Sequence, residues 1–162
     1  MKLNKQKIKA LEIILKKLKN KDINWKIIGS TNLVLQGVDV KSEDIDISTN
    51  KKGAYLIDSL FKKYVTKKVD LSIGLSKNNK YKSYFGKLKI NNVSVDIIGN
   101  LEYFDKKENK WIKSKKTKPI FIEYKKYKIP LNNLKDEFEF YKKYRKDDTY
   151  KKIAKKIDSF KK

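Results

Sequence analysis

The chain lacks the side chains that many enzymes use for catalysis and metal binding. Its 162 residues include no cysteine and no histidine. Thiol nucleophiles, imidazole mechanisms and most zinc sites are therefore excluded. Carboxylates are nearly the only ligands that the sequence offers to a metal, and their hard oxygen atoms suit magnesium.

Long apolar runs are missing too. No segment reaches the roughly 18 to 20 apolar residues needed to cross a bilayer, and lysines alternate through the amino terminus where a signal peptide would have an apolar core. We therefore expect a cytoplasmic protein, and the lack of cysteine is compatible with that location. At this length the chain is expected to form a single domain over residues 1–162.

Arginine is almost absent, although the chain is strongly basic. Lysine and arginine number 42 against 19 acidic residues, which gives a net charge of +23, and Arg145 is the only arginine. Such a field attracts polyanions, so one interpretation is an RNA acceptor or partner. The chain is also rich in isoleucine, asparagine and tyrosine. Their codons are rich in A and T, so genome composition is an alternative explanation for the lysines.

The spacing of apolar residues predicts an α/β fold. Leu11, Leu15 and Leu18 recur at helical spacing and predict an amphipathic helix over residues 4–19. Another helix is expected between residues 54 and 64, and two more are expected in the carboxyl-terminal part with a break near 147–148. Strands are expected over residues 24–28, 44–48, 65–75, 81–90, 93–98, 120–124 and 127–129. Residues 105–118, dense in charge around one tryptophan, predict an exposed loop or a ragged hairpin.

The most informative part of the sequence begins at a predicted strand end. Ile28 ends the strand, Gly29 allows a tight turn, and Ser30 is expected to cap a short helix that continues through Leu35. Such a turn presents backbone N–H groups and the positive end of the helix dipole to an anion. A phosphate is therefore the natural ligand of this turn.

Thirteen residues separate Ser30 from Asp44, and a second carboxylate follows at Asp46. Side chains alternate between the faces of a strand, so the two aspartates share one face and Ile45 and Ile47 share the other. Each half of the pattern is common by itself, in ordinary helix starts and in surface strands. Together, in this order, they favour a site for a triphosphate and its metal ions.

The pattern resembles the signature of the polymerase-beta-like nucleotidyltransferase superfamily: a hydrophobic residue, Gly, Gly or Ser, a gap, then Asp, hydrophobic, Asp or Glu, hydrophobic. Ile28, Gly29 and Ser30 match the first part, and Asp44 through Ile47 match the second. The resemblance implies an α/β (α+β) fold with a mixed sheet flanked by helices and with carboxyl-terminal helices. It also implies transfer of a nucleoside monophosphate from a nucleoside triphosphate, such as ATP, to a hydroxyl acceptor with two Mg²⁺ ions. The phosphates would rest on Ser30 and on the backbone after Gly29.

Members of the superfamily usually need a third carboxylate on a neighbouring strand. Asp96 lies on a predicted strand that should be buried, where an unpaired carboxylate is costly and a metal would be one partner. A paired lysine or exposure to solvent is the alternative, and Asp70 is a lower-ranked rival because it comes earlier in the expected sheet order. By resemblance, Asp44, Asp46 and Asp96 are the catalytic residues and metal ligands, and Asp96 also helps to deprotonate the acceptor.

The carboxyl-terminal part is similar to small single-domain relatives of the lincosamide and aminoglycoside nucleotidyltransferases and of AbiEii-type abortive-infection transferases. In those relatives a helix lysine and a basic residue followed by Asp lie near the nucleotide. The similarity assigns Lys142 to a phosphate and Arg145 and Asp147 to the helix ends, while Tyr144 stands where the relatives have glycine. For Lys142, exposure to solvent is the alternative.

The resemblance divides the chain into three parts. It implies an amino-terminal helix within residues 1–20, a catalytic core over 24–129 and helices over 131–162.

Three functional hypotheses follow. The first is an active transferase whose acceptor is RNA, a small molecule or a protein side chain. The second is an inactive nucleotide- or RNA-binding module, against which the three retained carboxylates argue because clustered acids repel one another. The third is the transferase toxin of a toxin–antitoxin pair, a role that small single-domain relatives often have.

Overall fold

A computed structural model describes residues 3–76, 79–145 and 147–161. In chain order the elements are α1 (Lys5–Leu18), β1 (Trp25–Ile28), α2 (Gly29–Leu35), β2 (Ile45–Thr49), α3 (Lys51–Leu60), a 3-10 turn (Lys62–Tyr64), β3 (Val65–Ser76), β4 (Asn79–Ile90), β5 (Val93–Asp105), β6 (Lys110–Lys113), β7 (Ile120–Tyr124), β8 (Tyr127–Leu131), α4 (Leu134–Phe140), a π-helical turn (Tyr141–Arg145) and α5 (Thr149–Ser159). The α/β class with carboxyl-terminal helices is therefore confirmed.

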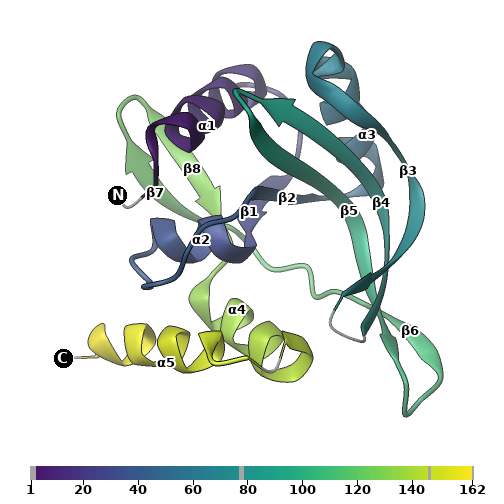
Figure 1. The fold of residues 1–162 in the computed structure, drawn as a ribbon, viewed down its shortest axis with the longest axis vertical. Coiled ribbons are helices and arrows are strands. Elements are labelled where there is room, and N and C mark those ends of the chain that lie inside the picture. The colour runs from purple at the N-terminus through teal and green to yellow at the C-terminus, as the bar shows by residue number, and fades with distance from the viewer. Residues whose placement is uncertain (1–2, 77–78, 146, 162) are drawn as a thin grey trace.

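The strands of the described residues form one mixed sheet in the order β3-β4-β5-β2-β1-β8-β7, with β6 paired to β5. β2 runs parallel to β5 and β1 runs parallel to β8, while the other neighbouring pairs are antiparallel. Figure 1 shows α1 and α3 toward one end of the molecule and α4 and α5 toward the other. None of the helices formed by these residues is both long and apolar enough to cross a membrane.

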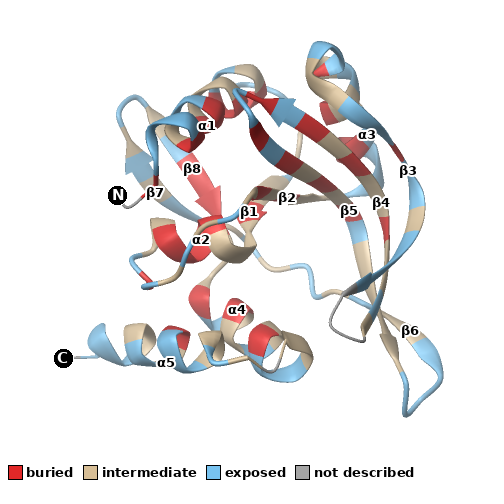
Figure 2. Ribbon diagram, in the orientation of Figure 1, coloured by how far each residue is buried: buried red, intermediate tan, exposed pale blue. Residues whose placement is uncertain are grey.

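The main core lies between α1, α3 and one face of the sheet, as the red segments of Figure 2 show. Helix α1 begins where Asn4 accepts a hydrogen bond from the Lys7 N–H at 2.9 Å, and it buries an apolar stripe that includes Leu11 and Ile14. The strands supply alternate residues, among them Ile47 of β2 and Ile97 of β5, both fully buried. Because strand side chains alternate, residues between these positions face away from the core.

A second, smaller core joins α2 to the carboxyl-terminal helices. It consists of the buried side chains of Leu33, Val38, Leu134, Tyr141 and Ile153. The helices α4 and α5 are thus fixed to the element that follows β1, and they do not extend freely from the domain.

Several element boundaries differ from the sequence predictions for local reasons. Helix α3 starts at Lys51, before the predicted residue 54, because Asn50 caps it by accepting the Gly53 N–H at 2.7 Å. Strand β5 continues to Asp105 because β6 pairs with its outer part. The segment 105–118 therefore contains the hairpin that was one of the two alternatives. Strand β8 runs through Pro130, which tolerates its missing N–H because β8 is in register with β1 only at Leu131.

Candidate active site

The register of the sheet brings two of the predicted carboxylates together. Asp46 of β2 lies beside Asp96 of the parallel strand β5 and opposite Ile28 at the end of β1. Paired residues on neighbouring strands point to the same face, so both carboxylates project away from the core. Asp44 lies just before β2, not within it as predicted, yet its carboxylate joins the other two. Oxygen atoms of the three side chains all lie within 4.8 Å of one another.

Helix α2 holds Asp44 in this position. The buried Thr31 hydroxyl donates a hydrogen bond to the backbone carbonyl of Asp44. The Glu43 N–H donates to Ser30 Oγ at 3.1 Å. The prediction that Ser30 caps α2 is wrong, because the helix begins at Gly29, two residues before the start that such a cap implies, and Ile28 occupies the capping position without a side-chain hydrogen bond. Ser30 instead fixes the segment that leads to Asp44.

Two of the three carboxylates, those of Asp46 and Asp96, are destabilised in their charged forms. Burial raises the pKa of Asp46 well above its usual range, and the charges of Asp44 and Asp96 raise it further. Burial also raises the pKa of Asp96, while the neighbouring Lys87 acts in the opposite direction.

Asp96 has a cationic neighbour, but one of its carboxylate oxygens lacks a hydrogen bond. The Lys87 ammonium lies 3.2 Å from Asp96 Oδ1, so the alternative of a paired lysine is realised in part. Oδ1 is nevertheless buried and accepts no hydrogen bond of good geometry. Three clustered carboxylates with one unsatisfied oxygen are a suitable donor set for a hard divalent cation such as Mg²⁺.

Asp70 lies outside this cluster. It is exposed on β3 at the edge of the sheet, and its carboxylate accepts the N–H of the next residue, Leu71, at 2.7 Å. The ranking of Asp96 above Asp70 agrees with this geometry.

Gly29 brings the backbone against Asp46. Its φ of +69° lies in the left-handed region, and a Cβ added there would be 2.5 Å from Asp46 Oδ2. A side chain here would strain the backbone and press on the Asp46 carboxylate, so glycine suits the turn after β1, the Gly29 bend.

Glu137 of α4 is a residue of this site that the sequence analysis missed. Its side chain is 2% exposed, and its Oε1 accepts hydrogen bonds from the Gly29 N–H at 3.1 Å and from Asn32 Nδ2 at 2.9 Å. Burial raises the pKa of Glu137 to about 7. A signal was present, because Glu137 occupies a position on the face of the helix that carries Leu134 and Tyr141, where an apolar residue is expected.

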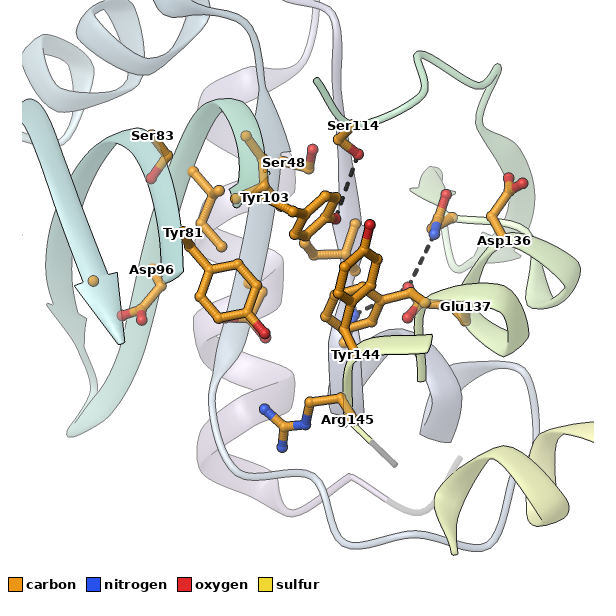
Figure 3. A pocket seen from close by; sticks show the side chains of 18 of the residues that line it. Ser48, Tyr81, Ser83, Asp96, Tyr103, Ser114, Asp136, Glu137, Tyr144 and Arg145 are labelled. Atoms are coloured by element: carbon orange, nitrogen blue, oxygen red, sulfur yellow. Dashed lines mark hydrogen bonds between the residues drawn. The ribbon is translucent and has the colours of Figure 1, made fainter. Parts of the chain in front are cut away.

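A cleft of about 940 Å³ opens beside the carboxylates. Its lining includes the three aspartates, the Gly29 bend and an aromatic wall from β4, β5 and the π-helical turn. In the wall, Tyr103 stacks on Tyr144 with ring centroids 4.4 Å apart, and Tyr81 meets Tyr103 edge-on at 5.6 Å. Figure 3 shows this wall between Asp96 on one side and Glu137 on the other.

Lys142 is not among the residues that line the cleft, whereas Lys143 and Arg145 are. The Lys142 ammonium instead lies over the Phe138 ring, 5.5 Å from its centroid, in an exposed part of the helix. The π-helical turn over 141–145 has a wider hydrogen-bond spacing than an α-helix and rotates its side chains relative to the α-helical pattern. The geometry thus favours the alternative of a solvent-exposed Lys142.

The fold and the site can be compared with known proteins. The sequence model of the aminoglycoside-2''-adenylyltransferase family matches residues 10–157. The chain is similar to the crystal structure of a "putative nucleotidyltransferase" from Thermotoga maritima, with 31% identity, a TM-score of 0.80, and coverage of 97% of this chain and 96% of that one. No protein of curated function matches the chain significantly.

A more distant structure shares the fold alone. ANT(2")-Ia, crystallised in complex with adenylyl-2"-tobramycin, has 11% identity and a TM-score of 0.54 over 96% of this chain and 91% of that one. With the family match spanning nearly its whole length, the chain belongs to the aminoglycoside-2''-adenylyltransferase family of the nucleotidyltransferase superfamily.

Proposed function

We propose that this protein is a metal-dependent nucleotidyltransferase that moves a nucleoside monophosphate from a nucleoside triphosphate to a hydroxyl acceptor. The observation that carries the proposal is the convergence of Asp44, Asp46 and Asp96 within 4.8 Å beside the Gly29 bend. Two bound Mg²⁺ ions would neutralise the triphosphate and stabilise the attacking and leaving oxygens of an in-line displacement.

The side chains of the site divide this work. Asp44, Asp46 and Asp96 would hold the cations. Asp96 would also receive the proton of the acceptor hydroxyl. Ser30 Oγ already accepts the Glu43 N–H, so its own O–H is free to donate to a phosphate.

In this proposal the basic side chains that bind the phosphates are Lys143 and Arg145, and not Lys142. Both line the cleft, and they approach it from the π-helical turn. Arg145 is the only arginine of the chain, and a guanidinium can bind a phosphate through two parallel N–H groups where an ammonium acts as a point charge.

The acceptor is a hydroxyl of a small molecule or of RNA. The distant structure holds an adenylylated aminoglycoside, which makes small amino sugars one candidate class. The net charge of +23 favours a polyanionic acceptor over a polycationic one. The volume of about 940 Å³ is at the upper end of ligand sites, so it can hold a nucleotide and part of an acceptor together.

Transfer of label from each α-labelled nucleoside triphosphate tests the proposal. The protein is incubated with Mg²⁺ and, separately, with cellular RNA, a panel of aminoglycosides, or no added acceptor. Label transfer that needs Mg²⁺ supports the enzyme and identifies the acceptor class. Retention of RNA with no transfer from any nucleotide supports the inactive module instead, and growth arrest on expression tests the toxin hypothesis.

Asp46→Asn should abolish transfer while the domain stays folded. The substitution removes a metal ligand, and a loss of about 10²-fold or more is the scale expected when one preorganised electrostatic contact is removed. The melting temperature without metal should hold or rise, because the change also removes a buried charge that Asp44 and Asp96 repel. Asp70→Asn, on the exposed edge strand, is the matched control and should keep full activity. Turnover of Asp46→Asn within a few-fold of the parent would show that the assigned metal site is wrong.

A further inference from the structure

Three hydrogen-bond donors converge on one oxygen of Glu137. Oε1 accepts from the Gly29 N–H at 3.1 Å, from Asn32 Nδ2 at 2.9 Å and from Asn132 Nδ2 at 3.1 Å. These donors belong to α2 and to the segment after β8, while Glu137 belongs to α4. A single buried atom thus joins three parts of the chain beside the cleft.

The neighbouring groups leave Oε1 no role except that of acceptor. Asn132 Oδ1 accepts from the Lys26 ammonium at 2.8 Å, and an ammonium can only donate. Asn32 Oδ1 accepts from Gln36 Nε2 at 2.8 Å. Both asparagines must therefore present their Nδ2 groups to Glu137. Oε1 serves as an acceptor whether or not the carboxyl group carries a proton.

The hydrogen bond between Gly29 and Glu137 connects Glu137 to Asp46, a proposed metal ligand, through a single residue. Glu137 fixes the peptide nitrogen of Gly29, while the Cα of Gly29 packs so closely on Asp46 that an added Cβ would lie 2.5 Å from its Oδ2. Glycine is the residue with the freest backbone, so a turn at this position needs an external contact to hold one conformation. Asn32 gives Glu137 a second attachment to the same helix, three residues further on.

We propose that Glu137 is a positioning residue that holds the Gly29 bend against Asp46 through the acceptor oxygen Oε1, not through its charge. It acts on the nucleotide site through its hydrogen bonds to Gly29 and Asn32. The effect of Glu137 on enzyme kinetics rests on the proposed function, whereas its effect on the conformation of the Gly29 bend does not.

Two substitutions separate the acceptor from the charge. Glu137→Gln keeps an oxygen that can receive the three donors and removes the charge. Glu137→Ala removes the acceptor and leaves the Gly29 N–H and two amide groups without it. Leu134→Ala is the matched control, because Leu134 is also buried on α4 but packs in the second core with Leu33 and Tyr141. It should loosen the docking of α4 without removing a contact to Gly29.

Amide hydrogen exchange at Gly29, followed by NMR, tests the geometry without any assay of activity. Exchange should be slow in the parent and in Glu137→Gln. Glu137→Ala and Leu134→Ala are then compared at equal global stability. Exchange at Gly29 should be faster in Glu137→Ala by about tenfold or more, the order expected for the loss of one buried hydrogen bond. Equal exchange at Gly29 in these two variants would overturn the proposal.

Steady-state kinetics give the second readout, at a temperature where all variants are folded. Glu137→Ala should raise the KM for the nucleoside triphosphate by about tenfold, again the scale of one buried hydrogen bond. Leu134→Ala should leave this KM near the parent value, and Glu137→Gln should restore it. If Glu137→Gln loses as much activity as Glu137→Ala, the charge is what matters and the positioning role is wrong. If the parent transfers no nucleotide at all, the proposed function fails, while the exchange rates still decide the role of Glu137.

Discussion

Gly29 is the residue on which the geometry of the site depends most directly. Its left-handed backbone and its contact with Asp46 Oδ2 both disfavour a side chain. The two constraints have different consequences, because the first concerns stability and the second concerns the position of a catalytic carboxylate.

Gly29→Ala should therefore lower stability and activity together. A left-handed conformation costs a non-glycine residue on the order of 1 to 2 kcal/mol, which urea unfolding would measure. The added Cβ should also displace Asp46 and reduce transfer by about 10²-fold, the scale of a misplacement of about 1 Å at a reacting centre. Gly74→Ala is the matched control, because Gly74 lines the same cleft and an added Cβ would meet nothing within 4 Å. If Gly29→Ala kept normal transfer, the close contact with Asp46 would be unimportant for the reaction.

At the scale of elements, the junction between α4, α2 and the end of β8 contains a titratable group. Burial raises the pKa of Glu137 from the ordinary 4.5 to about 7, so the folded protein binds this proton more tightly than the unfolded chain does. The stabilisation by this proton is complete below the ordinary pKa and is lost as the pH rises through the folded-state pKa.

The free energy of unfolding of the parent, relative to that of Glu137→Gln, should therefore fall between about pH 4.5 and pH 7, by up to a few kcal/mol. Denaturant unfolding of both proteins at several pH values measures this difference. Asp96, whose pKa is also raised, is present in both proteins, so its contribution cancels. The charge of Glu137 is one cause of the raised pKa of Asp46, so the difference also contains the coupling between these two groups. A difference that does not change with pH would mean that Glu137 titrates normally.

The elements also show why the site was only partly predictable. The Gly29 bend and Asp44 and Asp46 lie within one short segment, so local spacing identified them. Asp96 was recognisable as an acid within a buried strand, and its pairing with Asp46 depends on the parallel register of β2 and β5. Glu137 bonds to a residue 108 positions away, and no local pattern specifies such a contact.

At the scale of the whole molecule, the dominant feature is a net charge of +23. Several of the described ion pairs are exposed, as for Lys110 with Glu108 and Lys161 with Asp158, and such pairs contribute little to stability. Self-repulsion among the unbalanced lysines should therefore be the main electrostatic contribution to folding of this chain.

Sodium chloride should raise the melting temperature between about 0.02 M and 0.2 M, because the screening length falls from roughly 20 Å to below 10 Å over this range. Retention of RNA should weaken over the same range, since bound counterions are released on association. A neutral osmolyte at the same osmolality is the control for effects that do not depend on charge. A melting temperature that stays constant or falls with salt would contradict the expected repulsion.

The amino-acid sequence by itself determined the α/β class, the Gly29 bend and the pair of acids before and within β2, because each depends on residues that are neighbours along the chain. The tertiary structure alone decided that Asp96 joins this pair, that Glu137 contacts Gly29, and that Lys143 and Arg145 line the cleft in place of Lys142. These features depend on strand register, on the docking of α4 and on the rotation of side chains in a π-helical turn. The first two are set by contacts between segments far apart in the sequence, which spacing along the chain does not encode, and the third departs from the α-helical spacing that a sequence pattern assumes.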